Sequence, residues 1–227
     1  MSPSRVLPGA GVPLDRFPFH PLKRPVTTFV MASRLAREKG VLEYLEAAER
    51  LKRERPGLRF LLAGSPDPSG DGLSVRDVTS FGTAVEYLGE VADIRPVLLK
   101  AECLVLPSLR EGMPRSVMEA SALGRMAIVS DVKGCRDAIE AGKTGFLCEP
   151  RSAASLADAM RRATQLTPSE VAAMSREARA LAERRFDERL STHAYIEFAL
   201  GIAGARRPST PAGSGDRSGR PLRQDAK

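Results

Sequence analysis

The chain has 227 residues, a formal net charge of +7, and 42% hydrophobic and 28% charged residues. These values are typical of a soluble globular protein with one domain or one domain plus extensions. No apolar run approaches the roughly 18–20 residues that span a bilayer, and the N-terminus lacks the apolar core of a signal peptide, so we expect a cytoplasmic protein. The 3 scattered cysteines and 2 distant histidines argue against a disulfide framework and against a metal site.

The two ends of the chain differ in composition from its middle. Residues 1–25 contain six prolines and are predicted to form a linker rather than a helix or a central strand. Residues 201–227 are rich in Pro, Gly and Ser, so we expect a disordered tail. From Ile202 to Lys227, five Arg and one Lys stand against two Asp, a net charge of +4. Such a tail can bind an anionic membrane surface. A simpler explanation is that it is a disordered end that keeps the protein soluble. It lacks the aromatic residues that stack on bases, and we expect no nucleic-acid partner.

Residues 26–200 alternate between apolar runs of strand length and segments with helical spacing. Strands are predicted at 26–32, 58–64, 85–89, 103–108, 126–131 and 145–150, and helices at 41–54, 73–81, 94–101, 116–124, 152–166, 168–185 and 187–200. Because the strands are continuously apolar, we predict an α/β fold with a parallel sheet covered by helices on both faces. Ligands of such sheets bind where the strands end, near the topological switch point.

Basic residues follow the first predicted strand, in the segment SRLAREKG from Ser33 to Gly40. Arg34, Arg37 and Lys39 lie near the start of the next helix, where the helix dipole disfavours cations. A bound anion would explain them, because N–H groups and basic side chains act together on phosphate. A solvated basic turn is an equally good explanation of the charge placement.

A glycine-containing loop, AGSPDPSGDG from Ala63 to Gly72, follows the second predicted strand. Gly64 would let the backbone approach a ligand closely. The segment lacks the spacing of the known phosphate-binding glycine loops, and an ordinary turn explains it more simply.

Two glutamates, Glu111 and Glu119, follow the fourth predicted strand within REGMPRSVME. Pro114 suits the first position of the next helix, whose start would accept an anion. The N–H groups near this start belong to Gly112, Met113 and Arg115. Glu111 would lie in the loop and Glu119 inside the helix, so the two carboxylates can address different parts of one elongated ligand. A carboxylate can accept hydrogen bonds from the two hydroxyls of a vicinal diol, such as that of a ribose. A simpler explanation is that Glu111 is a first-turn charge favoured by the helix dipole and that Glu119 is an exposed helical residue.

Several motifs in the same order resemble the retaining GT-B glycosyltransferases of family 4 over about residues 9–200. The spacing of Glu111 and Glu119 resembles the E-x7-E motif of that family, and Ser33–Gly40 resembles its phosphate-binding Arg…Lys-Gly element. Gly9–Phe17 looks like its linker between two Rossmann-like domains. Val85–Leu147 is similar throughout to members that carry a Pro-Gly-Cys-Arg-Glu variant, from which Lys133 and Asp137 depart.

The resemblance implies the C-terminal half of a GT-B fold. Residues 1–25 would be an interdomain linker remnant, 26–200 a Rossmann-like domain that binds a nucleotide sugar, and 201–227 a disordered basic tail. We expect the N-terminal GT-B domain, which binds the acceptor, to be absent. The last helix would normally return to that domain, so we expect an exposed apolar patch formed by Phe186, Tyr195, Phe198 and Leu200.

The implied reaction transfers a sugar from a nucleoside diphosphate donor, with UDP as the expected nucleotide, and retains the anomeric configuration. Glu111 would contact the transferred sugar as the catalytic residue, Arg34 and Lys39 would bind the diphosphate, and Glu119 would hold the ribose. The other donor-binding residues that the resemblance implies are Gly64, Glu86, Tyr87, Leu88, Gly112, Met113, Pro114 and Arg115. Neither a cofactor nor a metal is expected, because cationic side chains and helix ends stabilise the leaving diphosphate.

The resemblance further implies a glycan or polyprenol-linked acceptor, in the synthesis of lipopolysaccharide or exopolysaccharide at the inner face of the cytoplasmic membrane. Three hypotheses remain open for the chain by itself. In the first, the chain is an enzyme fragment from a truncated or split gene. In the second, it is a binding subunit that docks a partner chain with the N-terminal GT-B domain. In the third, it is a regulatory or relic domain that binds nucleotide sugars without catalysing a reaction.

Overall fold

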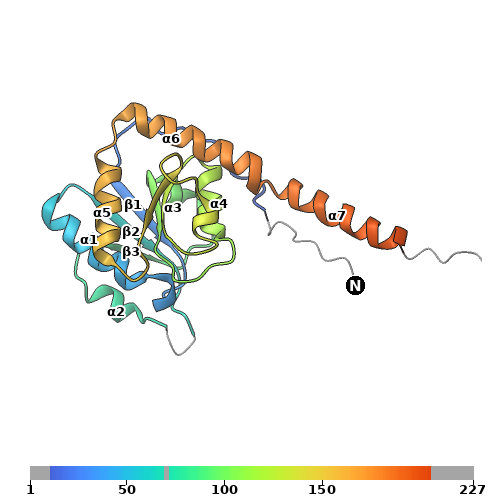
Figure 1. Cartoon of the computed structure of the whole chain (residues 1–227). Helices are drawn as coiled ribbons and strands as arrows, with labels where there is room; N and C mark the ends of the chain where they lie inside the picture. The colour runs from blue at the N-terminus through green and yellow to red at the C-terminus, as the bar shows by residue number, and fades with distance from the viewer. Residues whose placement is uncertain (1–10, 69–71, 206–227) are drawn as a thin grey trace, which may run out of the picture.

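The computed structural model describes residues 11–68 and 72–205, with side chains described as far as residue 200. Its strands are β1 (Thr28–Ala32), β2 (Arg59–Ala63), β3 (Glu86–Gly89), β4 (Cys103–Leu106), β5 (Met126–Ser130) and β6 (Gly145–Cys148). They form one six-stranded sheet in the order β3-β2-β1-β4-β5-β6, and every neighbouring pair is parallel (Figure 1). The predicted parallel sheet is confirmed.

Helices connect the strands. They are α1 (Val41–Glu54), α2 (Val75–Thr79), α3 (Arg95–Leu99), α4 (Arg115–Ala122), α5 (Ala153–Thr164), α6 (Pro168–Leu181) and α7 (Glu188–Ala205). Short turns of 3-10 helix, η1 (Arg37–Lys39) and η2 (Arg136–Ala138), and a π-helical turn, η3 (Ala182–Phe186), complete the secondary structure. One detail of the sequence prediction is wrong: Pro114 precedes α4 as its N-cap, with an extended ψ of 112°, instead of occupying the first helical position.

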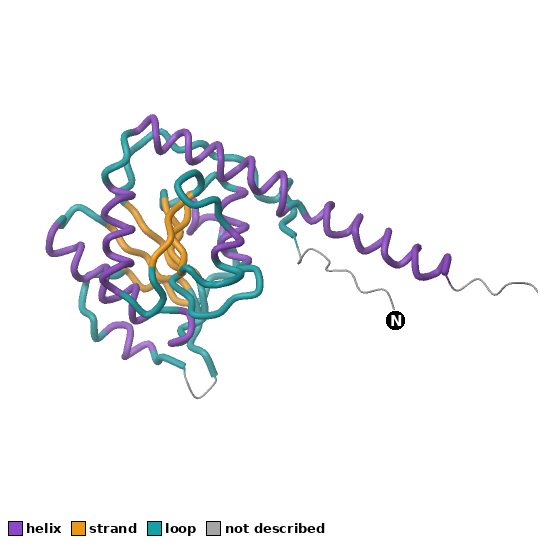
Figure 2. The backbone as a smooth tube through the Cα atoms, in the orientation of Figure 1, coloured by secondary structure: helices purple, strands orange, loops and turns teal. Residues whose placement is uncertain are grey.

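The sheet is buried between two layers of helices, which explains why its strands are apolar throughout. On one face α1 and α5 pack over Phe29, Phe60 and Ile128. On the other face α4 and η3 pack over Leu104 and Val129. Figure 2 shows the helices on both sides of the strands, and α6 crosses from one side to the other. The predicted helix cover of both faces is therefore confirmed.

Residues 11–25 contain neither a helix nor a strand of the sheet, but they are not detached from the domain. Val12, Leu14 and Phe17 are buried in the same cluster as Phe186 of η3. The N–H of Val12 donates to the carbonyl of Phe186 at 2.6 Å. This segment therefore covers part of the core that the sheet and α4 leave open.

Helix α7 extends away from the body of the domain (Figure 1). Its exposed apolar side chains are Leu190, Tyr195, Ile196 and Leu200. Tyr195 and Leu200 are thus exposed as expected, but the exposed apolar residues are spread around more than half of the helix circumference and do not form one face. Phe186 was wrongly included, because it is buried against the N-terminal segment. Phe198 is only half-buried. Within the described residues, none of the helices has the length and apolar character needed to cross a membrane.

Tyr44 of α1 joins the helix layer to the sheet. Its side chain is fully buried, and its ring packs edge-on to Phe60 at 6.5 Å between centroids. The hydroxyl donates to the carbonyl of Leu61 at 3.0 Å and lies 3.3 Å from that of Phe29. Burial raises the pKa of Tyr44 well above its ordinary value, so the phenol stays neutral and remains a donor.

We expect Tyr44→Phe to lower the free energy of unfolding by about 1 kcal/mol, because it removes one buried hydrogen-bond donor without opening a cavity. Urea denaturation measures this change. Tyr195→Phe is the matched control, since Tyr195 is exposed on α7 and its substitution should leave stability unchanged. Equal stabilities of the two variants would contradict a contribution of the Tyr44 hydroxyl.

Candidate functional site

The site predicted from the sequence lies at the topological switch point of the sheet. From β1 the chain proceeds outward to β2 and β3, and then returns to β4 on the other side of β1. The loops that follow β1 and β4 therefore separate at the carboxyl edge, where ligands of such sheets bind. They are joined through the carbonyl of Glu38, which accepts from the N–H of Leu109 at 2.8 Å and lies 3.1 Å from the Ser108 hydroxyl.

Lys39 and Glu111 meet across this junction. Lys39 Nζ lies 2.8 Å from Glu111 Oε1, and each side chain is only 15% exposed. A charged pair in such a position is stronger than one in open water, because the dielectric around it is lower. The structure thus brings together two predicted site residues that are distant in the sequence.

Arg34 lies on the other side of the loop after β1 and pairs with a carboxylate that the sequence prediction missed. Its Nη1 forms an ion pair with Asp67, and its Nη2 lies 3.6 Å from Glu38 Oε1. The Asp67 side chain is almost fully buried, whereas Arg34 is half exposed. The N–H of Leu35 donates to the carbonyl of Ser65 at 2.9 Å, which brings the loop after β2 against the loop after β1.

A hollow of about 220 Å³ opens between these loops and the start of α4. Its lining residues are Ala32, Ser33, Arg34, Ala63, Gly64, Ser65, Glu90, Val91, Ile94, Ser116 and Glu119. Glu119 is nearly buried in its wall, and its carboxylate accepts from Arg115 Nε at 2.9 Å. No side chain caps the N-terminus of α4, so the positive end of that helix contributes to the electrostatics of the hollow.

Two glycines of this edge allow close approaches of backbone to backbone. At Gly64, with a φ of +153°, a Cβ atom would lie 1.7 Å from the carbonyl oxygen of Ser33. The glycine therefore lets the ends of β1 and β2 meet, and it also lines the hollow, so its expected close approach to a ligand stays a prediction. At Gly134, with a φ of +85°, a Cβ atom would lie 2.2 Å from the carbonyl oxygen of Glu111. The loop after β5 thus rests directly on the Glu111–Gly112 turn.

Three residues expected to flank the base lie on β3, outside the lining of the hollow. Glu86 is exposed and pairs with Arg59 at 3.0 Å. The hydroxyl of Tyr87 donates to the carbonyl of Gly64 at 2.8 Å. Leu88 packs against the core cluster beside α4. Only Tyr87 reaches the hollow, indirectly through Gly64.

Cys135 lies beside the ion pair of Lys39 and Glu111 but is no nucleophile at neutral pH. Its side chain is fully buried. Burial raises the pKa of the Cys135 thiol to about 12, and the nearby Glu111 carboxylate contributes in the same direction. The thiol therefore stays protonated and acts as a packing group. Within residues 11–68 and 72–200, no three His, Cys, Asp or Glu side chains gather in a way that could hold a metal ion.

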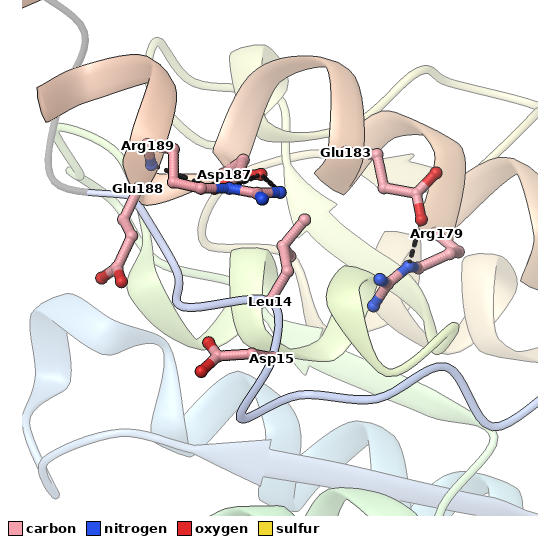
Figure 3. Close-up of a pocket in the computed structure, with 7 residues that line it drawn as sticks. All are labelled: Leu14, Asp15, Arg179, Glu183, Asp187, Glu188 and Arg189. Atoms are coloured by element: carbon pink, nitrogen blue, oxygen red, sulfur yellow. Dashed lines mark hydrogen bonds and ion pairs between the residues drawn. The ribbon is translucent and has the colours of Figure 1, made fainter. Parts of the chain in front are cut away.

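A larger hollow, of about 780 Å³, involves none of the predicted donor-binding residues (Figure 3). Its arginines are already engaged: Arg179 pairs with Glu183 at 2.7 Å, and Arg189 pairs with Asp187. Arg179 also donates to the carbonyls of Phe17 and Ala122. Figure 3 shows both pairs beside Leu14 of the N-terminal segment. We interpret this hollow as the joint between that segment, α6 and α7.

Comparisons with known proteins identify the family of the chain and relate its fold to solved structures. Residues 26–165 match the family described as glycosyl transferases group 1. The chain is 36% identical over 136 residues to N,N'-diacetylbacillosaminyl-diphospho-undecaprenol alpha-1,3-N-acetylgalactosaminyltransferase of Campylobacter jejuni, with 60% of this chain and 34% of that protein covered.

Two solved structures share the fold. A sucrose-phosphate synthase from Thermosynechococcus elongatus matches with a TM-score of 0.70 at 24% identity, covering 86% of this chain and 52% of the other. Anabaena Alr3699/HepE, solved in complex with UDP-glucose, matches with a TM-score of 0.66 at 21% identity, covering 77% of this chain and 49% of the other. The chain thus spans about one third of the first relative and about half of each solved GT-B chain. Because the family match extends over more than half of its length, the chain belongs to the group 1 glycosyltransferases.

Proposed function

We propose that the chain binds a nucleoside diphosphate sugar, with uridine as the nucleoside, and forms the donor half of a retaining glycosyltransferase. The observation that carries this proposal is the arrangement at the switch point. Lys39 and Glu111 meet there, and Arg34 and Glu119 line the adjoining hollow. The UDP-glucose complex of a structural neighbour supports the choice of nucleotide.

Arg34, Lys39 and the N-terminus of α4 would stabilise the leaving diphosphate. Negative charge grows on the diphosphate as its bond to the sugar breaks, and preorganised cations and N–H groups lower the energy of that state. In the structure both cations face carboxylates, Asp67 and Glu111. An arginine has five donors and a lysine has three, so each can contact phosphate while it keeps its carboxylate. In this proposal the side chains and the helix end supply the positive charge, and no metal is required.

The two glutamates would act at different parts of the donor. Glu119 is nearly buried in the wall of the hollow, where its carboxylate can accept hydrogen bonds from the hydroxyls of a ribose. Glu111 lies in the loop beyond the diphosphate cations, where it would contact the hydroxyls of the transferred sugar. The Gly112–Met113 turn between them would offer backbone N–H groups to the sugar and phosphate.

The acceptor would be a glycan or a polyprenol-linked sugar, in keeping with the diphospho-undecaprenol acceptor in the name of the Campylobacter jejuni relative. Holding donor and acceptor together supplies much of the rate of such a transfer. The exposed apolar residues of α7 favour association with a separate acceptor-binding domain, at the inner face of the cytoplasmic membrane. The second candidate function is a nucleotide-sugar-binding subunit or relic without chemistry.

We expect UDP to bind, and we expect Arg34→Ala and Lys39→Ala each to weaken its binding by about tenfold or more, because each loses a charge-assisted hydrogen bond to the diphosphate. Isothermal titration calorimetry measures both affinities. Uridine, which lacks the phosphates, should bind the wild type and the two variants equally. Lys143→Ala is the control, since Lys143 is exposed and lies outside the hollow. Absence of heat with UDP at millimolar concentration would refute the donor site.

Gly134→Ala should weaken the binding of a UDP-sugar more than that of UDP. The added methyl group would push the Glu111–Gly112 turn away, and that turn faces the sugar end of the proposed donor. Gly142→Ala is the matched control, because Gly142 has a similar φ of +80° but a Cβ atom added there would meet nothing within 4 Å. Parallel losses for UDP and UDP-sugar in Gly134→Ala would contradict a position of this turn at the sugar.

Incubation with a radiolabelled UDP-sugar and a lipid-linked acceptor tests the catalytic part of the proposal. We expect transfer only when an N-terminal GT-B domain is added as a separate chain, because that domain would hold the acceptor. Transfer by the chain alone would show that it carries a complete site. Binding of the donor without transfer under either condition would favour the non-catalytic subunit.

A further inference from the structure

A basic hollow lies at the opposite edge of the sheet, where the strands begin. It has a volume of about 290 Å³ and is lined by Pro21, Leu22, Lys23, Arg24 and Arg125. Arg125 directly precedes β5, and residues 21–24 shortly precede β1. None of the residues assigned to the donor site lines this hollow, so it is independent of the proposed function.

Arg125 is only 4% exposed, although it carries a guanidinium group. Its Nη2 donates to the carbonyl of His20 at 2.6 Å. Its Nε is buried and, within the part of the chain that the structure describes, has no hydrogen-bond partner. Burial lowers the pKa of Arg125 to about 10, so the side chain is still charged at neutral pH. A buried guanidinium group with so few partners is costly, which favours an anion in the adjoining hollow that balances its charge.

The charges around the hollow are not balanced. Glu102 is the nearby carboxylate, and it is fully buried behind the hollow. It accepts from Arg24 Nε at 2.6 Å and from the N–H groups of Thr27 and Thr28. Its charge is therefore largely committed to Arg24 and to the start of β1, although it also partly offsets the burial of Arg125. Within the described residues, neither Lys23 nor Arg125 forms an ion pair. The described residues that line the hollow include no acidic side chain.

We propose that this hollow binds a phosphate group, with Arg125 donating from its floor and Lys23 and Arg24 contacting it from the rim. A phosphate carries up to two negative charges at neutral pH and several acceptor oxygens, which match the charges of Lys23 and Arg125, neither of which has an ion pair within the described residues. The hollow is larger than one phosphate ion, so it also accommodates the phosphate of an ester. Free phosphate and the phosphate of a lipid headgroup share this chemistry, and the experiment below separates them.

The test is a titration of the full chain with inorganic phosphate, followed in ¹H–¹⁵N spectra through the Arg125 Nε–H signal. At constant ionic strength, we expect a saturable shift of this signal with phosphate and none with chloride. Lys23→Gln should weaken the binding roughly threefold, the effect of one exposed charge, and should leave the fold intact because Lys23 is exposed. Lys143→Gln, which removes an exposed lysine elsewhere, should bind like the wild type.

Several results would overturn the proposal. They are an Arg125 signal that does not move, a shift that chloride reproduces, and equal affinities of Lys23→Gln and the wild type. Phosphate that perturbs only the amides of residues 33–40 and 111–119 would be bound at the donor edge and would likewise refute this site. If the site binds phosphate, co-sedimentation with phosphatidylglycerol vesicles that is weakened in Lys23→Gln and absent with phosphatidylcholine assigns it to a headgroup. Absence of co-sedimentation assigns it to soluble phosphate or a soluble ester.

Discussion

The candidate site depends on the contact that joins the loop after β1 to the loop after β4. The carbonyl of Glu38 accepts from the backbone of Leu109, and this fixes the separation of two segments that leave the sheet on opposite sides of the switch point. Because the contact involves a backbone N–H, it holds the loops in one register whatever the neighbouring side chains do. Lys39 and Glu111 are the side chains that follow on each segment, so their ion pair is a consequence of this junction.

The two edges of the sheet handle positive charge differently. At the carboxyl edge, Arg34 and Lys39 each face a carboxylate of the same chain, so these side chains are ordered before a ligand arrives. At the amino edge, Arg125 is held by a single carbonyl. A cation that is already ordered loses little conformational freedom when it binds an anion. A buried cation with few partners, such as Arg125, instead gains a hydrogen-bond acceptor and a counter-charge. In the two proposals, the same residue types would serve two kinds of site on one fold.

Most of the fold and part of the site could be predicted from the sequence. The strands were predictable because a parallel sheet covered on both faces requires continuously apolar segments, as in the run around Val30 and that around Val105. Arg34, Lys39 and Glu119 were predictable from their spacing and from the family resemblance, and the structure places them at one edge. Their roles toward a donor remain predictions.

The missed features all arise from tertiary contacts. Asp67 is one acidic residue in a polar loop, and only the pairing of the loops after β1 and β2 brings it to Arg34. Phe186 was predicted to belong to the patch of the last helix, yet it lies in η3, where the N-terminal segment buries it. The close packing of Gly134 on the Glu111–Gly112 turn has no signature in local sequence, because it depends on how two loops from different strands meet.

The pairing of charges at the carboxyl edge also affects how a ligand finds the site. Arg34, Lys39 and Arg115 each face a carboxylate, so their fields largely cancel beyond the nearest neighbours. These three pairs therefore add little long-range attraction, and steering of an anion toward this edge would come from the net positive charge of the whole chain. Added salt would weaken that steering more than it weakens short-range hydrogen bonds to Arg34 and Lys39.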